Sequence, residues 1–318
     1  MPANVETMFY TGETPWHRLG KKVEHSLTAE EAITESGLDW PVDEAQVFIN
    51  SQPRDEYKAL VRSDNGFVLN VVNKTYKPVQ NRDAFKFFDE VTTVGSAKYH
   101  TAGSLNQGRQ IWLLAKLPGE LVITKEDVVE KFVLLANGHD GYHALTMQWT
   151  PIRVVCQNTL NIALADSAVR FYARHTQNAL QKAGAARDIL GIANRFYTEF
   201  LEKCQQMVKV PALPAPNLSR LISNIVGIEE GITVEESHKF RKEAYNKIMD
   251  LVETGKGQTP DIRGTDWGVF NAVAEWADFY MPVRSKREGA RSESILFGRG
   301  ADIKREAWDK ITANRTGM

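Results

Sequence analysis

Hydrophobic and polar positions follow two different periods along this chain, and the period changes near residue 175. Before that point, short apolar runs and alternating runs are separated by turn residues, a pattern that predicts strands. After it, apolar residues recur every three or four positions, which predicts amphipathic helices. The sequence therefore predicts a β-rich part over residues 1–175 and a helical part over residues 176–318 packed on it, either as two domains or as one continuous domain.

Short turns define the order of the predicted strands. Asp64-Asn65-Gly66 lies between two alternating runs, and Gln107-Gly108 lies between two others. Tight turns of this kind join antiparallel neighbours, whereas parallel strands need long crossovers. We therefore predict an α+β fold in which an antiparallel sheet meander spans about residues 44–175. Its strands are predicted at residues 46–50, 57–62, 67–72, 98–104, 109–117, 132–136, 143–150, 152–156 and 169–173.

Capping residues mark where the predicted helices begin. Thr28 with Glu31, and Thr233 with Glu236, have the spacing of a capping box, in which each side chain accepts a hydrogen bond from the other residue's backbone N–H group. Asn81 is the predicted N-cap of a helix with one apolar face. The apolar spacing from residue 176 to 208 predicts a long helix, which the prolines that follow it end.

The stretch from Lys131 to Ala165 couples two predicted strands to a helix. Residues 137–141 predict a turn, because their Asn, Asp and two Gly residues tolerate positive φ. Pro151 is predicted to close the strand before it, and Asn158 is predicted to cap the helix. The residues predicted to be buried in this stretch are Leu134, Leu145, Met147, Val155, Cys156 and Leu160.

Composition excludes several classes of protein. The 318 residues hold 39 Lys and Arg against 40 Asp and Glu, so the net charge is −1 and a globally basic nucleic-acid coat is excluded. Cys156 and Cys204 each lie in an apolar pattern, which indicates buried, reduced thiols rather than a disulfide framework. No apolar run approaches the roughly 18 residues of a membrane span, and no signal-peptide pattern precedes the strands. We expect a cytoplasmic protein with no membrane partner.

Histidines in the first half of the chain raise the question of a metal site. The spacing of His139 and His143 around Asp140 suits metal binding on a helix, but the glycines beside them predict a turn. His100 and His175 lie far away in sequence, and a turn in which Asp140 bonds its own backbone explains the same residues. No nucleophile elbow, phosphate-binding loop or dinucleotide fingerprint is present. The sequence predicts no metal, no cofactor and no catalytic residue.

Two groups of basic residues are the remaining candidates for a site. Seven basic residues lie between Arg284 and Arg305, with three acids among them. Local positive clusters in a neutral chain are typical of phosphate binding, although a solvated surface is the more common explanation of a charge run. A second group, Arg153, Arg170 and Arg174, lies beside the predicted strand–helix stretch. An internal ion pair and a ligand contact are both open for that group.

Several motifs make the chain resemble the phage/plasmid-like protein family. These are PWHRLG at 15–20, RVVCQNTLNIAL at 153–164, the pair Arg174-His175, GTDWGVFNAV at 264–273 and SESILFGRGADIKREAW at 292–308. The resemblance runs from about Thr14 to Trp308. It implies a protein that phages, plasmids or integrated elements carry and that works in the cytoplasm of the host cell. It implies no particular activity.

The predicted order of elements from Asn81 to Ala165 also resembles the sheet-and-helix core of single-strand annealing proteins. That resemblance implies single-stranded DNA in a basic groove, a homo-oligomeric ring or filament, and contacts to phosphates and bases rather than catalysis. The predicted nucleic-acid contacts form two sets. Those that would face phosphates in the groove are Arg109, Arg153, Arg170 and Arg174. Those that would form a second basic strip are Arg284, Lys286, Arg287 and Arg291.

Two other functions stay open at this point. One is an interaction protein that acts on host or defence factors through a protein surface. The other is an enzyme with an unrecognised site, for which His139, Asp140, His143 and Cys156 would have to converge. Salt-dependent oligonucleotide binding separates nucleic-acid recognition from both.

Overall fold

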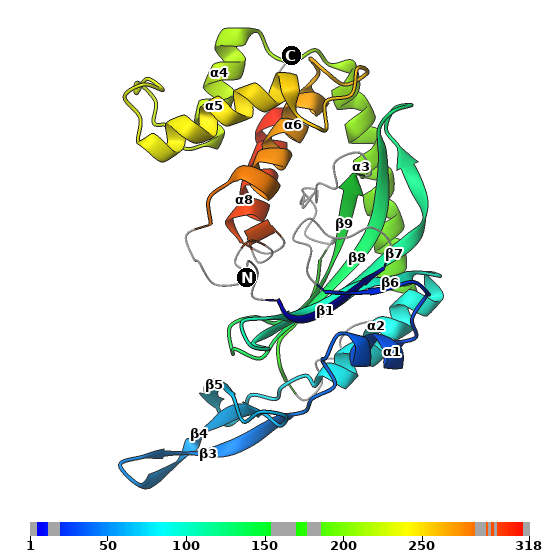
Figure 1. Cartoon of the computed structure of the whole chain (residues 1–318), viewed down its shortest axis with the longest axis vertical. Coiled ribbons are helices and arrows are strands. Elements are labelled where there is room, and N and C mark those ends of the chain that lie inside the picture. The colour runs from blue at the N-terminus through cyan, green and yellow to red at the C-terminus, as the bar shows by residue number, and fades with distance from the viewer. Residues whose placement is uncertain are drawn as a thin grey trace.

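The structure, a computed structural model, describes residues 5–11, 20–153, 170–176, 186–283, 291, 294–295 and 298–313. It has an α+β fold with a seven-stranded sheet, a three-stranded sheet and more helices toward the C-terminus (Figure 1). The α+β class predicted from the sequence is confirmed. None of the helices in the described ranges combines the length and the apolar character needed to cross a bilayer.

The seven-stranded sheet has the strand order β10-β9-β8-β7-β6-β1-β2. From β6 to β10 each strand pairs antiparallel with the next one along the chain, which is the predicted meander. The N-terminal strands extend the sheet beyond β6, and β1 pairs parallel with β2. The bounds are β1 Val5–Thr11, β2 Lys21–Val23, β6 Lys98–Leu105, β7 Gln110–Val122, β8 Val128–Gly138, β9 Leu145–Arg153 and β10 Arg170–Ala173.

The expectation of one sheet over residues 44–175 is wrong, because the early strands form a sheet of their own. β3 (Val42–Ile49), β4 (Gln52–Arg62) and β5 (Val68–Asn73) pair antiparallel with one another. The hairpin predicted at Asn65-Gly66 is confirmed, and Gly66 has φ of 73°. This three-stranded sheet projects from the body of the molecule at the end opposite the helical region (Figure 1). We call it the arm.

The two sides of the arm differ in burial. On one side, Leu60 is fully buried and the Arg62 guanidinium lies 4.3 Å from the centre of the Trp40 ring. On the other side, Tyr57, Val68 and Val71 are 46%, 47% and 47% exposed. At the outer end, Phe48 and Ile49 of β3 are 61% and 49% exposed. A half-buried strand normally carries polar residues on its solvent side, so this apolar exposure is a distinctive property of the arm.

Pro151 lies inside β9 and does not end it, contrary to the prediction. β9 pairs with β8 from Thr146 to Arg153, with Pro151 opposite Lys131. β10 covers β9 only from Leu145 to Gln148. The missing N–H group of Pro151 is therefore tolerated on a part of β9 that β10 does not cover. The predicted residues Val155, Cys156, Asn158 and Leu160 lie outside the described residues.

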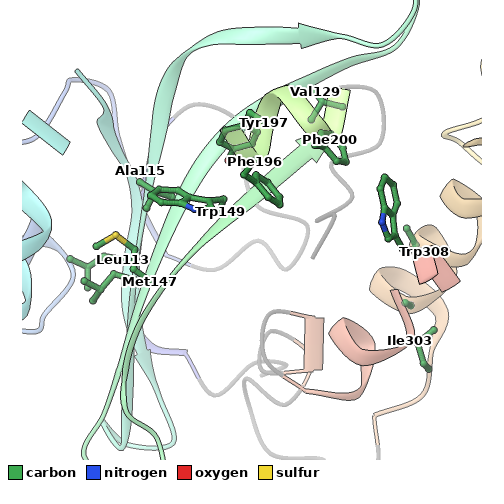
Figure 2. Close-up of a cluster of buried hydrophobic side chains, with 14 of the residues drawn as sticks. Leu113, Ala115, Val129, Met147, Trp149, Phe196, Tyr197, Phe200, Ile303 and Trp308 are labelled. Atoms are coloured by element: carbon green, nitrogen blue, oxygen red, sulfur yellow. The ribbon is translucent and has the colours of Figure 1, made fainter. Parts of the chain in front are cut away.

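Both faces of the seven-stranded sheet are apolar. One face, with Leu113, Ala115 and Met147, packs in a core shared with Phe196 and Phe200 of α3 (Ala186–Lys209) (Figure 2). Trp112, Leu114, Phe132 and Leu134 form a second buried cluster on the opposite face. The predicted burial of Leu134, Leu145 and Met147 is confirmed, since their exposed fractions are 1%, 0% and 1%.

Helix α2 (Asn81–Val94) packs against α3, helix α1 (Ala29–Glu35) packs against α2, and both contribute to the same core. The capping box of Thr28 and Glu31 is confirmed, since both reciprocal hydrogen bonds are present. The prediction that Asn81 caps its helix is wrong. Gln80 occupies the N-cap position, and Asn81 bonds other segments, as described below.

A tyrosine of α3 binds the backbone of the large sheet. The Tyr197 hydroxyl accepts a hydrogen bond from the Phe132 N–H group at 2.8 Å and donates one to the Phe132 carbonyl. Tyr197 is 3% exposed, and burial raises the pKa of its hydroxyl, so the group stays protonated. This contact fixes α3 to one position along β8.

The helical region packs on the sheet through aromatic side chains. Phe200 of α3 stacks on Trp308 at 5.8 Å between ring centres, and the Trp267 Nε1–H group donates to Asp127 in the β7–β8 loop at 2.5 Å. Inside this region the Lys304 ammonium lies 2.6 Å from Asp278, and both side chains are buried. The elements are α4 Ala215–Ile225, α5 Lys239–Thr254, α6 Asp266–Glu275, the π-helix η3 Trp276–Tyr280 and α8 Arg299–Ala313. The Thr233–Glu236 capping bonds form, but α5 begins only at Lys239.

Candidate functional site at the junction of the two sheets

Four segments that are distant in sequence meet where the arm joins the seven-stranded sheet: residues 74–80, 105–109, 138–144 and 173–176. Backbone hydrogen bonds connect them. The Lys77 N–H group donates to the His175 carbonyl at 3.2 Å, and the His139 N–H group donates to the Arg109 carbonyl at 2.7 Å. The arm joins this set through the Asn70 side chain, which donates to the Asp140 carbonyl.

His139 lies at the centre of the junction and has no exposed surface. Its Nε2 atom is 2.8 Å from Oδ1 of Asn81, whose Nδ2 group donates to the carbonyls of Leu38 and Trp40. Because Asn81 uses its amide group as a donor, Oδ1 is the acceptor and His139 Nε2 carries the proton. Burial lowers the pKa of His139 to about 3, so the ring is neutral at physiological pH.

His175 is the second buried imidazole. Its Nδ1 atom accepts a hydrogen bond from the Val79 N–H group at 3.1 Å, and its ring stacks on Tyr76 at 4.9 Å between centres. Burial lowers the pKa of His175 to about 4. The Tyr76 hydroxyl donates to the Gly138 carbonyl at 3.3 Å, and burial raises its pKa. These contacts fix β10 and the segment before α2 against the β8–β9 turn.

Asp140 and His143 form a pair at the surface of the same turn. Asp140 Oδ2 lies 2.6 Å from His143 Nδ1, and Oδ1 accepts from the N–H groups of Tyr142 and His143 at 3.0 Å each. Burial alone would raise the pKa of Asp140, but the hydrogen bonds from His143 and Tyr142 outweigh it, and the pKa is lowered. A turn is present, but it lies at residues 139–144 rather than 137–141, because β8 continues to Gly138; within it Asp140 bonds its own backbone as predicted.

A glycine makes this turn possible. A Cβ atom at Gly138 would lie 2.5 Å from His143 Cβ and 2.7 Å from the His143 carbonyl oxygen. The backbone of His143 therefore passes directly over Gly138, where any side chain would displace it.

The geometry limits the chemistry of these groups. Asp140 can orient the imidazole of His143, as a carboxylate does beside a general base. His139, which the enzyme hypothesis requires at the same site, is buried and bonded to Asn81, so it cannot reach a substrate there. Cys156 lies outside the described residues. Within the described ranges, no group of three or more His, Cys, Asp or Glu side chains is arranged to hold a metal ion.

Cations and tyrosines are exposed on the outside of the junction. Tyr142 is 86% exposed and Tyr172 is 56% exposed, which is unusual for large aromatic side chains. Tyr172 and Arg174 are two residues apart on and just beyond the edge strand β10. We call this set of exposed residues the junction surface, and its members are Lys77, Arg109, Tyr142, His143, Tyr172 and Arg174.

Two of the predicted nucleic-acid contacts belong to the junction surface. Arg109 donates through Nε to the Leu69 carbonyl at 2.8 Å, lies 5.3 Å from the centre of the Phe67 ring and remains exposed. Arg174 is exposed beyond the end of β10. Neither has an ion-pair partner among the described residues. The structure thus brings Arg109 and Arg174 to one junction.

The other predicted contacts are placed less completely. Arg153 pairs with Val129 and Arg170 pairs with Gln148 in the sheet, and their side chains lie outside the described part of the structure. Arg291 is half-buried and donates to the carbonyls of Asp278 and Met281, near the end of η3. Burial lowers its pKa. Arg284, Lys286 and Arg287 lie outside the described residues.

Sequence reasoning missed four residues of this site. Three of them belong to the junction surface: Lys77, Tyr142 and Tyr172. The fourth, Asn81, is buried and bonds His139. One signal was available, since Tyr142 lies directly after Gly141 in a polar turn, where no core is expected. The contact between Asn81 and His139 joins residues 58 positions apart, and no local pattern reports it.

Comparison with known proteins identifies one family. The family model described as "Domain of unknown function (DUF932)" matches residues 68–296. The matched range begins in β5 and includes the whole junction surface. No curated protein matches the chain. No solved structure matches it.

Proposed function

The chain belongs to the DUF932 family, and from the junction surface we propose that it binds single-stranded nucleic acid without base specificity. One observation carries the proposal: two widely exposed tyrosines and three exposed cations, Lys77, Arg109 and Arg174, lie on or directly beside the backbone segments that bond one another at the junction. Single-strand binding needs cations for the phosphates and flat aromatic rings for the bases. Unstacked bases are accessible only in single strands, so double-stranded nucleic acid should bind more weakly.

The electrostatics of the junction support an anionic ligand. Asp140 is the acid closest to Tyr142 in sequence, and its charge is engaged by His143 and by two N–H groups. The charges of Lys77 and Arg174 are not engaged in ion pairs within the described ranges. A local positive surface on a chain of net charge −1 attracts phosphates to one place only.

The test is a fluorescence anisotropy titration of a labelled oligothymidylate over a series of salt concentrations. We expect log affinity to fall linearly with log salt, by about 0.7 for each phosphate contact on a single strand. The double variant Lys77→Ala/Arg174→Ala should lose about 1 to 1.5 from that slope. Tyr142→Ala should lose about 1 to 3 kcal/mol of binding free energy with the slope unchanged, because stacking releases no counterions.

A matched control removes two cations elsewhere. Lys239 and Lys256 are exposed in the helical region, and Lys239→Ala/Lys256→Ala changes the net charge by the same amount. This control should keep the affinity and the slope of the parent chain. Affinity that does not depend on salt, or equal losses in the two double variants, would reject the proposal and favour an interaction protein with a protein partner.

The biological setting is part of the same proposal. We infer that the protein belongs to a phage or plasmid, acts in the host cytoplasm and uses single-strand binding for strand annealing. The support is the resemblance of its motifs to phage/plasmid-like proteins and of its element order to annealing proteins. Annealing is tested by mixing two complementary labelled strands and following their pairing by energy transfer. A Tyr142→Ala chain should anneal more slowly than the parent chain.

A further inference from the structure

The arm exposes apolar side chains that nothing in the described structure covers. Phe48 and Ile49 lie at its outer end, and Tyr57, Val68 and Val71 lie on its open side. β3 is also an edge strand of its sheet: among the described residues no strand pairs with its outer side, and the Gln80 side chain bonds only Val42 at its inner end. An exposed apolar edge of this kind is an aggregation hazard unless a specific partner occupies it.

The charge of the arm indicates which partner fits. The β3–β4 hairpin holds the exposed acids Asp43, Glu44, Asp55 and Glu56. Its bases are Arg54, Lys58 and Arg62. The Lys58 ammonium lies 2.6 Å from Glu44, with which it forms an ion pair, and Arg62 is buried and paired with Asp64. An acidic surface repels the phosphates of a nucleic acid. It also repels the same surface of a second arm, so a symmetric arm-to-arm contact is disfavoured.

A basic surface with exposed apolar rings is the complement of the arm, and the chain itself carries one. The junction surface presents Lys77, Arg109 and Arg174 beside Tyr142 and Tyr172. We propose that the outer end of the arm of one copy docks on the junction surface of a second copy, with Phe48 and Ile49 against the tyrosines and the acids against the cations.

Such a contact joins two different surfaces and therefore repeats. Each copy offers an arm to one neighbour and a junction surface to another, so the assembly grows head to tail into a ring or a filament. Because the same junction surface is proposed to bind single strands, a short oligonucleotide should compete with the arm. This competition rests on the proposed function, whereas self-association without nucleic acid does not.

The test measures mass by sedimentation velocity over a range of protein concentrations. The parent chain should form species larger than a monomer, and high salt should dissociate them. Asp55→Lys/Glu56→Lys on the arm should weaken self-association about tenfold or more, and Lys77→Glu/Arg174→Glu on the junction should do the same. A chain carrying all four reversals restores opposite charges and should associate again. Phe48→Asp should weaken association without affecting folding, because the side chain is exposed.

A control and a second readout separate the possible outcomes. Glu230→Lys/Glu253→Lys changes two exposed acids in the helical region and should leave self-association intact. Thermal unfolding shows that each variant folds. A parent chain that stays monomeric, or four reversals that fail to restore association, overturns the proposal. Oligonucleotide binding by the arm variant, measured at a protein concentration below self-association, reports separately on the proposed function.

Discussion

Lowering the pH from neutral to about 5 should destabilise the folded chain through two buried imidazoles. His139 and His175 are neutral in the folded state, because burial lowers their pKa values to about 3 and about 4. In the unfolded chain each histidine titrates near its ordinary pKa of about 6.5. Above that pH neither state binds the proton, and the stability is fully present. Below it the unfolded state binds protons that the folded state rejects, so stability falls.

The magnitude follows from the width of that interval. Between pH 6.5 and 5 each imidazole spans about 1.5 pH units, which costs about 2 kcal/mol per histidine and about 4 kcal/mol for the pair. A domain is typically stable by about 5 to 15 kcal/mol, so this loss is easily measured. The lowered pKa of a carboxyl such as Asp140 acts only at lower pH, below the ordinary value of about 4.

The assay is urea unfolding followed by circular dichroism at both pH values. His139→Gln and His175→Gln should each be less stable than the parent chain at neutral pH, because each loses junction contacts. On acidification, the free energy of unfolding of each variant should also fall by about 2 kcal/mol less than that of the parent chain, since one buried histidine with a lowered pKa has been removed. His25→Gln, at an exposed position, is the control. If all four chains lost the same free energy, the burial of these two rings would not control the pH dependence.

Further substitutions test single contacts, all by urea unfolding unless stated. Asn81→Ala should cost about 1 to 3 kcal/mol, because it leaves a buried imidazole without its acceptor. Gly138→Ala should displace His143, and a changed imidazole resonance in NMR spectra would report it; an unchanged spectrum would contradict the close approach. Asp278→Asn should cost about 3 to 5 kcal/mol by removing the carboxylate beside the buried Lys304, whereas Asp278→Leu with Lys304→Met should recover much of that loss. An Asp278→Asn chain as stable as the parent chain would show that Asp278 and Lys304 are not buried together.

Local patterns predicted the local parts of the fold. The turns at Gly66 and Gly108 require positive φ, and both residues have it, at 73° and 88°. The alternation around Leu145 and Met147 predicts which face of that strand is buried, and this prediction does not depend on which strands pair with it. Pairing between distant strands has no such local signature. Neither the addition of Val5–Thr11 to the edge of the sheet nor the separation of the arm could therefore be read from the sequence.

The site was predictable to a similar extent. Arg174 attracts attention as a charge beside a predominantly apolar stretch, because such a charge needs a partner or a ligand, whereas Arg109 was predicted only from the resemblance to annealing proteins. Their convergence depends on backbone bonds across long sequence distances, such as Lys77 to His175. The role of Asn81 was misjudged for the same reason. Asn before an apolar helical run is typical of a cap, and only tertiary structure shows that its amide reaches His139 instead.

The bond between Tyr197 and the backbone of Phe132 has a consequence for how opening of the molecule can be observed. The Phe132 N–H group donates a hydrogen bond to a side-chain hydroxyl of α3. Its exchange with deuterated solvent therefore requires the helix to lift from the sheet, while nearby amides of β8 need separation of the strands. The exchange rate of this one amide thus reports how often α3 separates from the sheet, and it can be measured in the intact protein without an attached label.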